Sequence, residues 1–247
     1  MNSLPRKDRR RFLEAAALGA VCAALGGLPL AARAARSPGA RMKIGIVGSG
    51  RVGGTLGEVW VKAGHQVMFS SLDIEHDRAL AARLGRNARA GSAREAAAFG
   101  DVVMVSVPYR ALRAVGRELG ALIRGKVVID TCNPFISRDG EIAAWARQKG
   151  VGLASAELLP GTRLVRAFNA IGYSSMGTAH EQPGRIGMPI AGDDAEAVAT
   201  ASRLIRDIGY EPVLVGGLAV GRHLMPGTAL AGEHTPDEIR RIAATLN

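Results

Sequence analysis

The chain has 247 residues, of which 47% are hydrophobic, 22% charged and 4% aromatic. This composition excludes a disordered or fibrous protein and supplies enough apolar material for one sizeable α/β domain or two small ones. The net charge of +10 does not indicate nucleic-acid binding, because residues 1–34 hold six basic and two acidic side chains and leave +6 for the remainder. The low aromatic content also disfavours base stacking, so we expect no nucleic-acid partner.

The first 34 residues have the order of a bacterial export signal. The basic stretch ending in Arg9-Arg10-Arg11-Phe12-Leu13 precedes a weakly apolar run over 15–30, and Ala32-Arg33-Ala34 offers the small residues of a cleavage site. The Arg-Arg-x-Phe-Leu spacing resembles a twin-arginine signal. We expect export to the periplasm, a linker over 35–41 and no membrane contact after processing. A cytoplasmic protein, or one anchored to the membrane by an uncleaved leader, is the alternative.

Residues 42–247 predict a single Rossmann-like domain of the α/β class, with a doubly wound, mostly parallel sheet extended by C-terminal strands. Lys43–Val47 is a short apolar run, typical of a strand buried on both faces of a parallel sheet. Thr235-Pro236-Asp237-Glu238 is a capping box that predicts a final helix. Helices alternate with further strands, which we expect at 65–69, 101–107, 126–130, 163–168, 185–191 and 211–215.

The first strand leads directly into Gly48-Ser49-Gly50-Arg51-Val52-Gly53, a G-x-G-x-x-G fingerprint. The first glycine permits a tight turn, the second lets the backbone approach a pyrophosphate, and the third lets the helix pack on the strand. The N-terminus of that helix offers free N–H groups and a partial positive charge. We therefore expect all six residues to bind a dinucleotide; a glycine-rich turn without a ligand is the alternative.

The end of the second strand distinguishes NADP from NAD. It reads Ser70-Ser71-Leu72-Asp73 and lacks, directly at the strand end, the carboxylate that would bind a ribose 2′-hydroxyl and repel a 2′-phosphate. We expect Ser70 and Ser71 to bind NADP(H), with Arg51 or Arg78 near the phosphate. Two alternatives stay open: Asp73 turns inward and binds NAD, or the serines only cap the next helix.

Three other strand ends place residues at the carboxyl edge of the sheet, where open α/β folds bind their ligands. Asn133 and Asn169 each follow a strand, so their amides could hold the nicotinamide or its ribose, or could merely cap turn backbone. The residues expected to complete the cofactor site are Val107, Pro108, Asn133, Asn169 and Ala170.

No catalytic side chain is assigned, because hydride transfer between two held rings needs little acid–base help from the protein. His223 could protonate a product and Cys132 could be a nucleophile, but no signature joins either to a partner. A lone cysteine in an apolar turn is more often structural. The five histidines lack metal-ligand spacing, so we expect no metal site.

Four motifs that follow the fingerprint carry a family resemblance: Val107-Pro108, Asp130–Phe135, Val165–Ala170 and Ala191–Asp194. In this order they resemble the NADP-dependent reductases of coenzyme F420, within a wider group of pyrroline-5-carboxylate reductase-like NADP-binding domains and the cytoplasmic domains of membrane ferric reductases. The resemblance covers residues 42–230. The family usually has Ser-Arg where this chain has Ser71-Leu72.

The resemblance implies an NADP-dependent oxidoreductase that exchanges a hydride between NADP(H) and a flat acceptor. Relatives that reduce imines or hydroxy acids usually carry an added helical domain, so we expect the acceptor to bind on the Rossmann domain itself, where a homodimer mate could assist. Coenzyme F420 is the implied acceptor, and a flavin or a ferric chelate is the alternative. A non-catalytic dinucleotide-binding or sensor protein is the alternative of another class.

Overall fold

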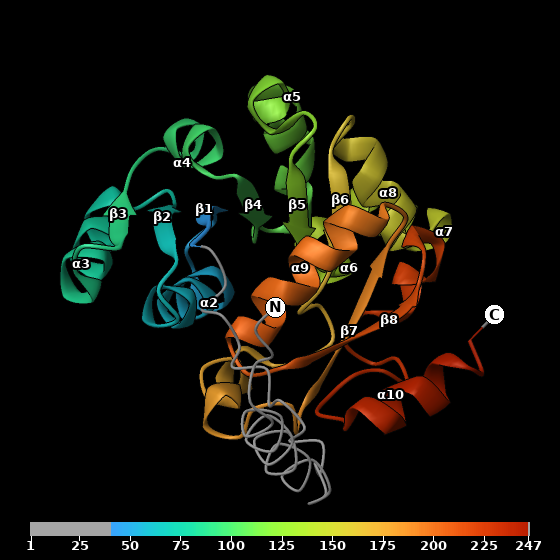
Figure 1. Cartoon of the computed structure of the whole chain (residues 1–247). Coiled ribbons are helices and arrows are strands. Elements are labelled where there is room, and N and C mark those ends of the chain that lie inside the picture. The colour runs from blue at the N-terminus through green and yellow to red at the C-terminus, as the bar shows by residue number, and fades with distance from the viewer. Residues whose placement is uncertain (1–40, 247) are drawn as a thin grey trace, which may run out of the picture. The chain divides into compact units, whose positions relative to one another are not determined.

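The computed structural model describes residues 41–246. The expected export signal, and the expected linker up to residue 40, lie outside the described residues. Within the described part of the chain, eight strands form one sheet in the order β3-β2-β1-β4-β5-β6-β7-β8 (Figure 1). The strands are β1 Lys43–Val47, β2 Gln66–Ser70, β3 Ala88–Ala90, β4 Val102–Val105, β5 Val127–Asp130, β6 Arg163–Arg166, β7 Gly187–Gly192 and β8 Glu211–Gly216.

Helices connect the strands and cover both faces of the sheet (Figure 1). The α-helices are α2 Arg51–Lys62, α3 Ile74–Leu84, α4 Ala93–Phe99, α5 Leu112–Ile123, α6 Ile136–Asp139, α7 Glu141–Lys149, α8 Val151–Leu158, α9 Ala195–Asp207 and α10 Pro236–Ala243. Short 3₁₀ helices are η1 Tyr109–Ala111, η2 Tyr173–Ser175, η3 Ala179–Glu181 and η4 Leu218–His223.

The strand order produces a switch point between β1 and β4. From β1 the chain runs outward through β2 and β3, then returns to β4 and continues to β6 on the other side, always in parallel pairs. β7 pairs antiparallel with β6, and β8 pairs parallel with β7. The predicted mostly parallel sheet with C-terminal extension is confirmed, and ligands bind at such a switch point outside the carboxyl ends of the strands.

Alternate residues of the central strands enter two separate cores, which is why these strands are almost uniformly apolar. In β4, Val102 and Met104 pack into the cluster that includes residues of α2 and α9. Val103 and Val105 pack into the other cluster, with residues of α5 and α8. Side chains of successive strand residues point to opposite faces, so burial on both sides removes the polar alternation of a half-exposed strand.

Among the elements that were not expected from the sequence are β3 and α8. β3 has only three residues at the edge of the sheet, too few to show a period. In α8, five of eight residues are buried and no single apolar stripe results. Its Gly152 lies so close to η4 that a Cβ would be 2.1 Å from the Leu218 carbonyl oxygen, so the two backbones pack directly. Contact of this kind leaves no amphipathic pattern to detect.

The predicted strand over 101–107 ends earlier in the structure. Pairing in β4 stops at Val105, and Ser106 to Pro108 leave the sheet and line a cavity. The predicted capping box is present, since Thr235 Oγ1 accepts from the Glu238 N–H and Glu238 Oε2 accepts from the Thr235 N–H at 2.8 Å. None of the helices in residues 41–246 combines the length and apolar character needed to cross a membrane.

Candidate functional site

The glycine loop joins β1 to α2 at the switch point, and two of its glycines are required by the fold itself. Gly48 has φ of +101°, a conformation that favours glycine, and a Cβ there would lie 2.2 Å from the Ser106 carbonyl oxygen. A Cβ on Gly53 would lie 2.1 Å from the Gly48 carbonyl oxygen. Gly48 therefore permits the turn, and Gly53 permits the close approach of helix to strand.

Gly50 is different, because nothing in the protein's own packing requires a glycine there. Its φ is −69°, and a Cβ would meet no atom within 4 Å. Gly50 is the N-cap of α2; within the described chain no side chain caps this helix, and its first turn holds no acidic residue. The open space and the uncapped N–H groups together fit a pyrophosphate of a dinucleotide.

Ser49 lies beneath the loop. Its side chain is fully buried, and its hydroxyl donates to the carboxylate of Asp77 in α3, which is also fully buried. The N–H groups of Gly48 and Ser49 both donate to the Ser70 carbonyl at 2.9 Å. Ser49 thus fastens the loop to β2 and α3, and the backbone of the next residues is what faces a ligand.

The two serines at the end of β2 have separate partners. Ser70 is buried and its hydroxyl donates to the Ile46 carbonyl at 2.6 Å. The Ser71 hydroxyl lies 2.9 Å from Asp77 Oδ2 and 3.0 Å from the Asp73 carbonyl oxygen. The carboxylate of Asp73 accepts from the His76 N–H at 3.0 Å, so Asp73, not a serine, provides the N-cap of α3.

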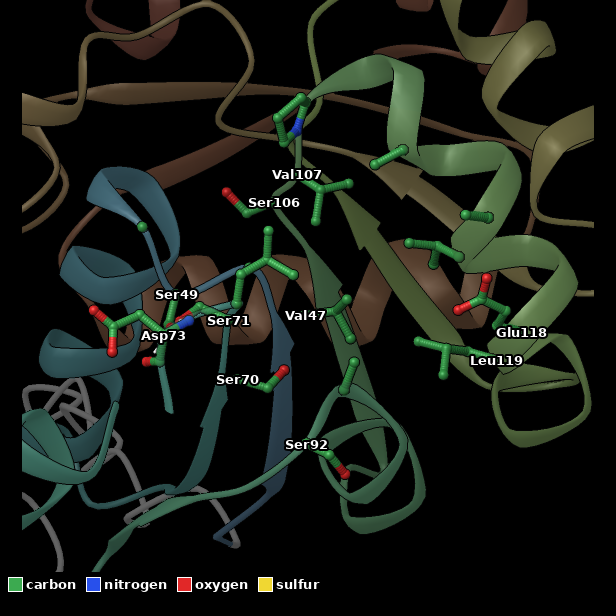
Figure 2. Close-up of a pocket in the computed structure, with 18 of the residues that line it drawn as sticks. Val47, Ser49, Ser70, Ser71, Asp73, Ser92, Ser106, Val107, Glu118 and Leu119 are labelled. Atoms are coloured by element: carbon green, nitrogen blue, oxygen red, sulfur yellow. Dashed lines mark hydrogen bonds between the residues drawn. The ribbon is translucent and has the colours of Figure 1, made fainter. Parts of the chain in front are cut away.

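A cavity of about 1050 Å³ extends from this strand end to α5. Figure 2 shows Ser49, Ser71 and Asp73 on one side of it, with Glu118 and Leu119 of α5 on the other. The ends of β1, β2 and β4 form its floor, and most of its lining surface is apolar. An apolar cavity beside the glycine loop, with hydroxyls at the strand end, suits the adenosine half of a dinucleotide.

A second pocket of about 240 Å³ lies on the other side of the glycine loop. The two pockets share Gly50, Ser106, Val107 and Pro108, so they adjoin across the loop. The expected site residues Arg51, Val52 and Asn133 also line the second pocket; its remaining lining residues are Thr131, Cys132, Phe135 and Arg138. The arrangement can hold the nicotinamide half of the same ligand at the ends of β4 and β5.

A buried ion pair supports the second pocket, and no sequence pattern predicted it. Arg166 and Asp130 are both fully buried, with Nη1 to Oδ2 at 2.5 Å. The other carboxylate oxygen of Asp130 accepts from the Cys132 N–H at 2.7 Å. Arg166 also donates to the carbonyl oxygens of Cys132 at 3.2 Å and Leu224 at 3.3 Å. The ion pair therefore fixes the turn after β5 and joins it to the segment after η4.

The two asparagines lie together behind this turn. Asn133 Nδ2 donates to the Asn169 carbonyl oxygen at 2.7 Å, and Asn169 Nδ2 lies 3.4 Å from the Cys132 carbonyl oxygen. Asn169 is 2% exposed, yet its Oδ1 has no hydrogen-bond partner. Such an oxygen costs about 1–3 kcal/mol. Asn169 lines neither of the two pockets, whereas Asn133, which donates to its carbonyl, lines the second.

The backbone before Asn169 is in an unusual conformation. Phe168 has φ of +64°, the one non-glycine residue of the described chain with a positive φ. Its ring is held edge-on between Trp60 and Tyr210, at centroid distances of 6.2 and 5.9 Å. A non-glycine residue in this region is strained and persists only where its surroundings impose it. Ala170 is buried and its carbonyl accepts from the Gly232 N–H at 2.8 Å.

The remaining sequence candidates have limited chemistry. Burial raises the pKa of the Cys132 thiol well above its ordinary value, and the nearby Asp130 adds to the effect, so the thiol is a poor nucleophile. His223 lies in η4, where its Nε2 is buried without a partner. Arg78 is exposed and pairs with Glu75 at 2.6 Å. Residues 41–246 contain no group of three or more His, Cys, Asp or Glu placed to hold a metal ion.

The geometry of the loop leads to a prediction for Gly50→Val. The valine side chain enters the space that fits a pyrophosphate, so we expect NADPH affinity to fall at least a hundredfold in isothermal titration calorimetry. Because a Cβ there meets no protein atom, we expect the free energy of unfolding to change by less than about 1 kcal/mol.

Gly53→Val is the matched control, because its side chain would collide with the backbone of the loop. It should lower the melting temperature strongly. Unchanged NADPH affinity in a well-folded Gly50→Val variant would show that the glycine loop is not the binding site.

Comparisons with known proteins agree with this geometry. Residues 43–134 match the model of a family described as NADP oxidoreductase, coenzyme F420-dependent. The F420-dependent NADP reductase of Methanothermobacter thermautotrophicus is 29% identical over 195 residues, which cover 73% of this chain and 84% of that protein. The metalloreductase STEAP3 of Rattus norvegicus is 29% identical over 185 residues, 74% of this chain but 35% of that protein.

Two crystal structures share the fold. A hypothetical protein from Sinorhizobium meliloti aligns with a TM-score of 0.62 and 22% identity, covering 77% of this chain and 93% of the other. A proposed F420-dependent NADP reductase from Arthrobacter sp. FB24 aligns with a TM-score of 0.63 and 20% identity, covering 73% of this chain and 87% of the other.

The predicted Rossmann-like fold, the resemblance to F420 reductases and the oxidoreductase class are confirmed by these comparisons. The chain carries an NADP-binding Rossmann domain, and its residues 43–134 match the family model of coenzyme F420-dependent NADP oxidoreductases.

Proposed function

We propose that this protein transfers a hydride between NADP(H) and a flat acceptor bound on the Rossmann domain, with coenzyme F420 as the acceptor. The observation that carries the proposal is the open space over Gly50, flanked by an apolar cavity on one side and a smaller pocket of mixed polarity on the other. An extended dinucleotide has this division into adenosine, pyrophosphate and nicotinamide. The relative from Methanothermobacter thermautotrophicus supports the choice of acceptor.

The chain's own residues bind and orient in this reaction. The glycine loop and α2 N-terminus would hold the pyrophosphate, and the cavity beside Ser71 would hold the adenosine. Asn133, positioned by its hydrogen bond to the Asn169 carbonyl oxygen, would hold the nicotinamide. Bound NADPH supplies the hydride, which carries two electrons, and a solvent proton completes reduction of the acceptor. The protein's contribution is to hold donor and acceptor carbons about 3–3.5 Å apart, for which no acid or base is needed.

The match to a metalloreductase favours iron as a second candidate acceptor. A ferric chelate accepts one electron at a time, whereas a hydride carries two. Direct transfer to iron would therefore leave one electron without an acceptor. A flavin is needed to accept both electrons and pass them to iron one at a time. A flat ring is thus the first acceptor in either version of the proposal.

The test is to mix the purified protein and NADPH with coenzyme F420, FMN, riboflavin and a ferric chelate, each alone and the chelate also with FMN. We expect oxidation of NADPH in step with bleaching of the F420 absorbance. Turnover with FMN alone would identify a flavin reductase. Tight NADPH binding without turnover of any acceptor would contradict the proposal and favour the sensor alternative.

Cofactor preference gives a second prediction. No acid other than the capping Asp73 follows the strand end, but Ser71 shares its hydroxyl with Asp77 and no arginine stands at position 72. We expect NADPH to bind about tenfold more tightly than NADH, which corresponds to about 1.4 kcal/mol. Leu72 is fully exposed, so Leu72→Arg has room to reach a 2′-phosphate and should raise the preference about tenfold more.

Leu72→Asp is the matched variant and should reverse the preference. Position 72 is a better test than Ser71, because a carboxylate at 71 would lie against the buried Asp77. Both affinities are measured by calorimetry. Wild-type protein that binds NADH at least as tightly as NADPH would show that the serines do not recognise the phosphate.

Export remains part of the proposal. Arg9, Arg10 and Arg11 with Phe12 and Leu13 support twin-arginine transport, which moves folded proteins and would let the protein leave the cytoplasm with its cofactor bound. We expect a mature N-terminus at Ala35 in the periplasm, found by N-terminal sequencing. Replacing the three arginines with lysine should retain the unprocessed chain in the cytoplasm. Intact protein beginning at Met1 in the soluble periplasm would contradict cleavage.

A further inference from the structure

Two arginine–aromatic pairs adjoin the second pocket, and their cation–π contacts are not part of the dinucleotide site described above. The guanidinium of Arg51 lies over the ring of Tyr173, 5.3 Å from its centroid, and that of Arg138 lies over the ring of Phe135 at 5.0 Å. Arg51, Phe135 and Arg138 line the pocket itself. Tyr173 comes from η2, in the segment that follows Asn169. The two pairs therefore reach the same opening from different strand ends.

Both aromatic rings are exposed where burial would be the favourable state. Phe135 is 38% exposed and Tyr173 is 44% exposed, and Ile136, beside Phe135, is 55% exposed. Neighbouring apolar side chains exposed at the mouth of a pocket are typical of a binding surface. Any acceptor of a hydride must stack on the nicotinamide, so it must lie at this mouth.

The charge at the mouth is positive. Arg51 is the first residue of α2 and lies at the positive end of the helix dipole. The first turn of α2 holds no acidic residue, and no carboxylate in residues 41–246 pairs with Arg51. A cation is unfavourable at that end of a helix, and a nearby anion would relieve the cost. Its side chain turns toward Tyr173, which leaves the backbone N–H groups of the loop for the pyrophosphate.

The Arg138 side of the mouth also has positive charge in excess. Arg138 donates to the Asn133 carbonyl oxygen at 2.8 Å and to Asp139. Burial of Asp139 opposes its ionisation, but hydrogen bonds from Arg138 and from the N–H groups of Phe135 and Arg110 lower its pKa overall. That single carboxylate lies near both Arg138 and Arg110, so it balances only one of the two.

We propose that the pairs Arg51–Tyr173 and Arg138–Phe135 form the acceptor site and select a flat, conjugated ring that bears an anionic substituent. This inference rests on the proposed function. The aromatic faces hold the ring, and the guanidinium groups, each fixed on its aromatic partner, bind the negative group on its side chain. A neutral acceptor with the same ring uses only the first of these interactions.

The experiment compares acceptors that share a ring and differ in charge. Binding to the protein saturated with NADP⁺ is measured by quenching of ring fluorescence, for FMN against riboflavin and for coenzyme F420 against its deazaflavin without the phosphate-containing tail. We expect the anionic member of at least one pair to bind about tenfold more tightly in low salt, and the ratio to shrink as salt is added.

The variants separate charge from stacking. Arg51→Gln with Arg138→Gln should reduce the ratio to below threefold, while Tyr173→Leu with Phe135→Leu should weaken both members of a pair and keep the ratio. Arg89→Gln is the control, since Arg89 lies over the Phe99 ring at 5.3 Å and lines neither pocket. It should change nothing. NADP⁺ affinity is measured separately on each variant, because Arg51, Phe135 and Arg138 line the pocket assigned to the nicotinamide.

Three outcomes would overturn the inference while leaving the NADP-dependent function standing. These are equal affinity of the anionic and neutral members for the wild-type complex, no binding of either pair, and a ratio that is unchanged in the double arginine variant. Loss of NADP⁺ affinity in the arginine variants would overturn it too, by assigning those side chains to the cofactor. Failure of the wild-type protein to bind NADP⁺ would instead defeat the proposed function, and the acceptor site with it.

Discussion

The nicotinamide side of the site depends on the buried ion pair between Asp130 and Arg166. Removing either partner would leave the other as an unpaired buried charge, which costs several kcal/mol. An apolar pair of the same volume could fill the space at equal or better stability. It could not hold the N–H and carbonyl of Cys132 and the carbonyl of Leu224. What the pair contributes is therefore position: it joins the ends of β5 and β6 to one turn and to the segment after η4.

Asp77 has the corresponding place on the adenosine side. Its buried carboxylate holds the hydroxyl of Ser49 from the glycine loop and that of Ser71 from the end of β2. The two segments that would bind the adenosine phosphates are thus fixed before a ligand arrives, which lowers the entropy lost on binding. The same carboxylate adds negative charge beneath the ribose position. Affinity for an additional phosphate then depends on what positive charge the rim supplies.

The sequence was sufficient for the fold and for the backbone part of the site. The apolar run of β1, the glycines and the capping box at Thr235 each depend on neighbours within a few positions, and local patterns record such constraints. The supports of the site are of another kind. Asp130 and Arg166 are 36 positions apart and Ser49 and Asp77 are 28 apart, and nothing in either segment identifies the partner. The positive φ of Phe168 is likewise imposed by Trp60 and Tyr210, which lie far away in the chain.

Two local stability costs of this domain lie just after β6, next to Asn133 of the second pocket. The unpaired oxygen of Asn169 and the strained backbone of Phe168 each cost about 1–3 kcal/mol. Gly50 has an extended backbone and a Cβ there would meet no atom, so neither backbone strain nor packing requires a glycine. Gly48 and Gly53, in contrast, are needed for the fold alone. Within the fingerprint it is therefore Gly50 that bears on function, because a bound pyrophosphate gives a steric reason for a glycine there and the packing of the free protein gives none.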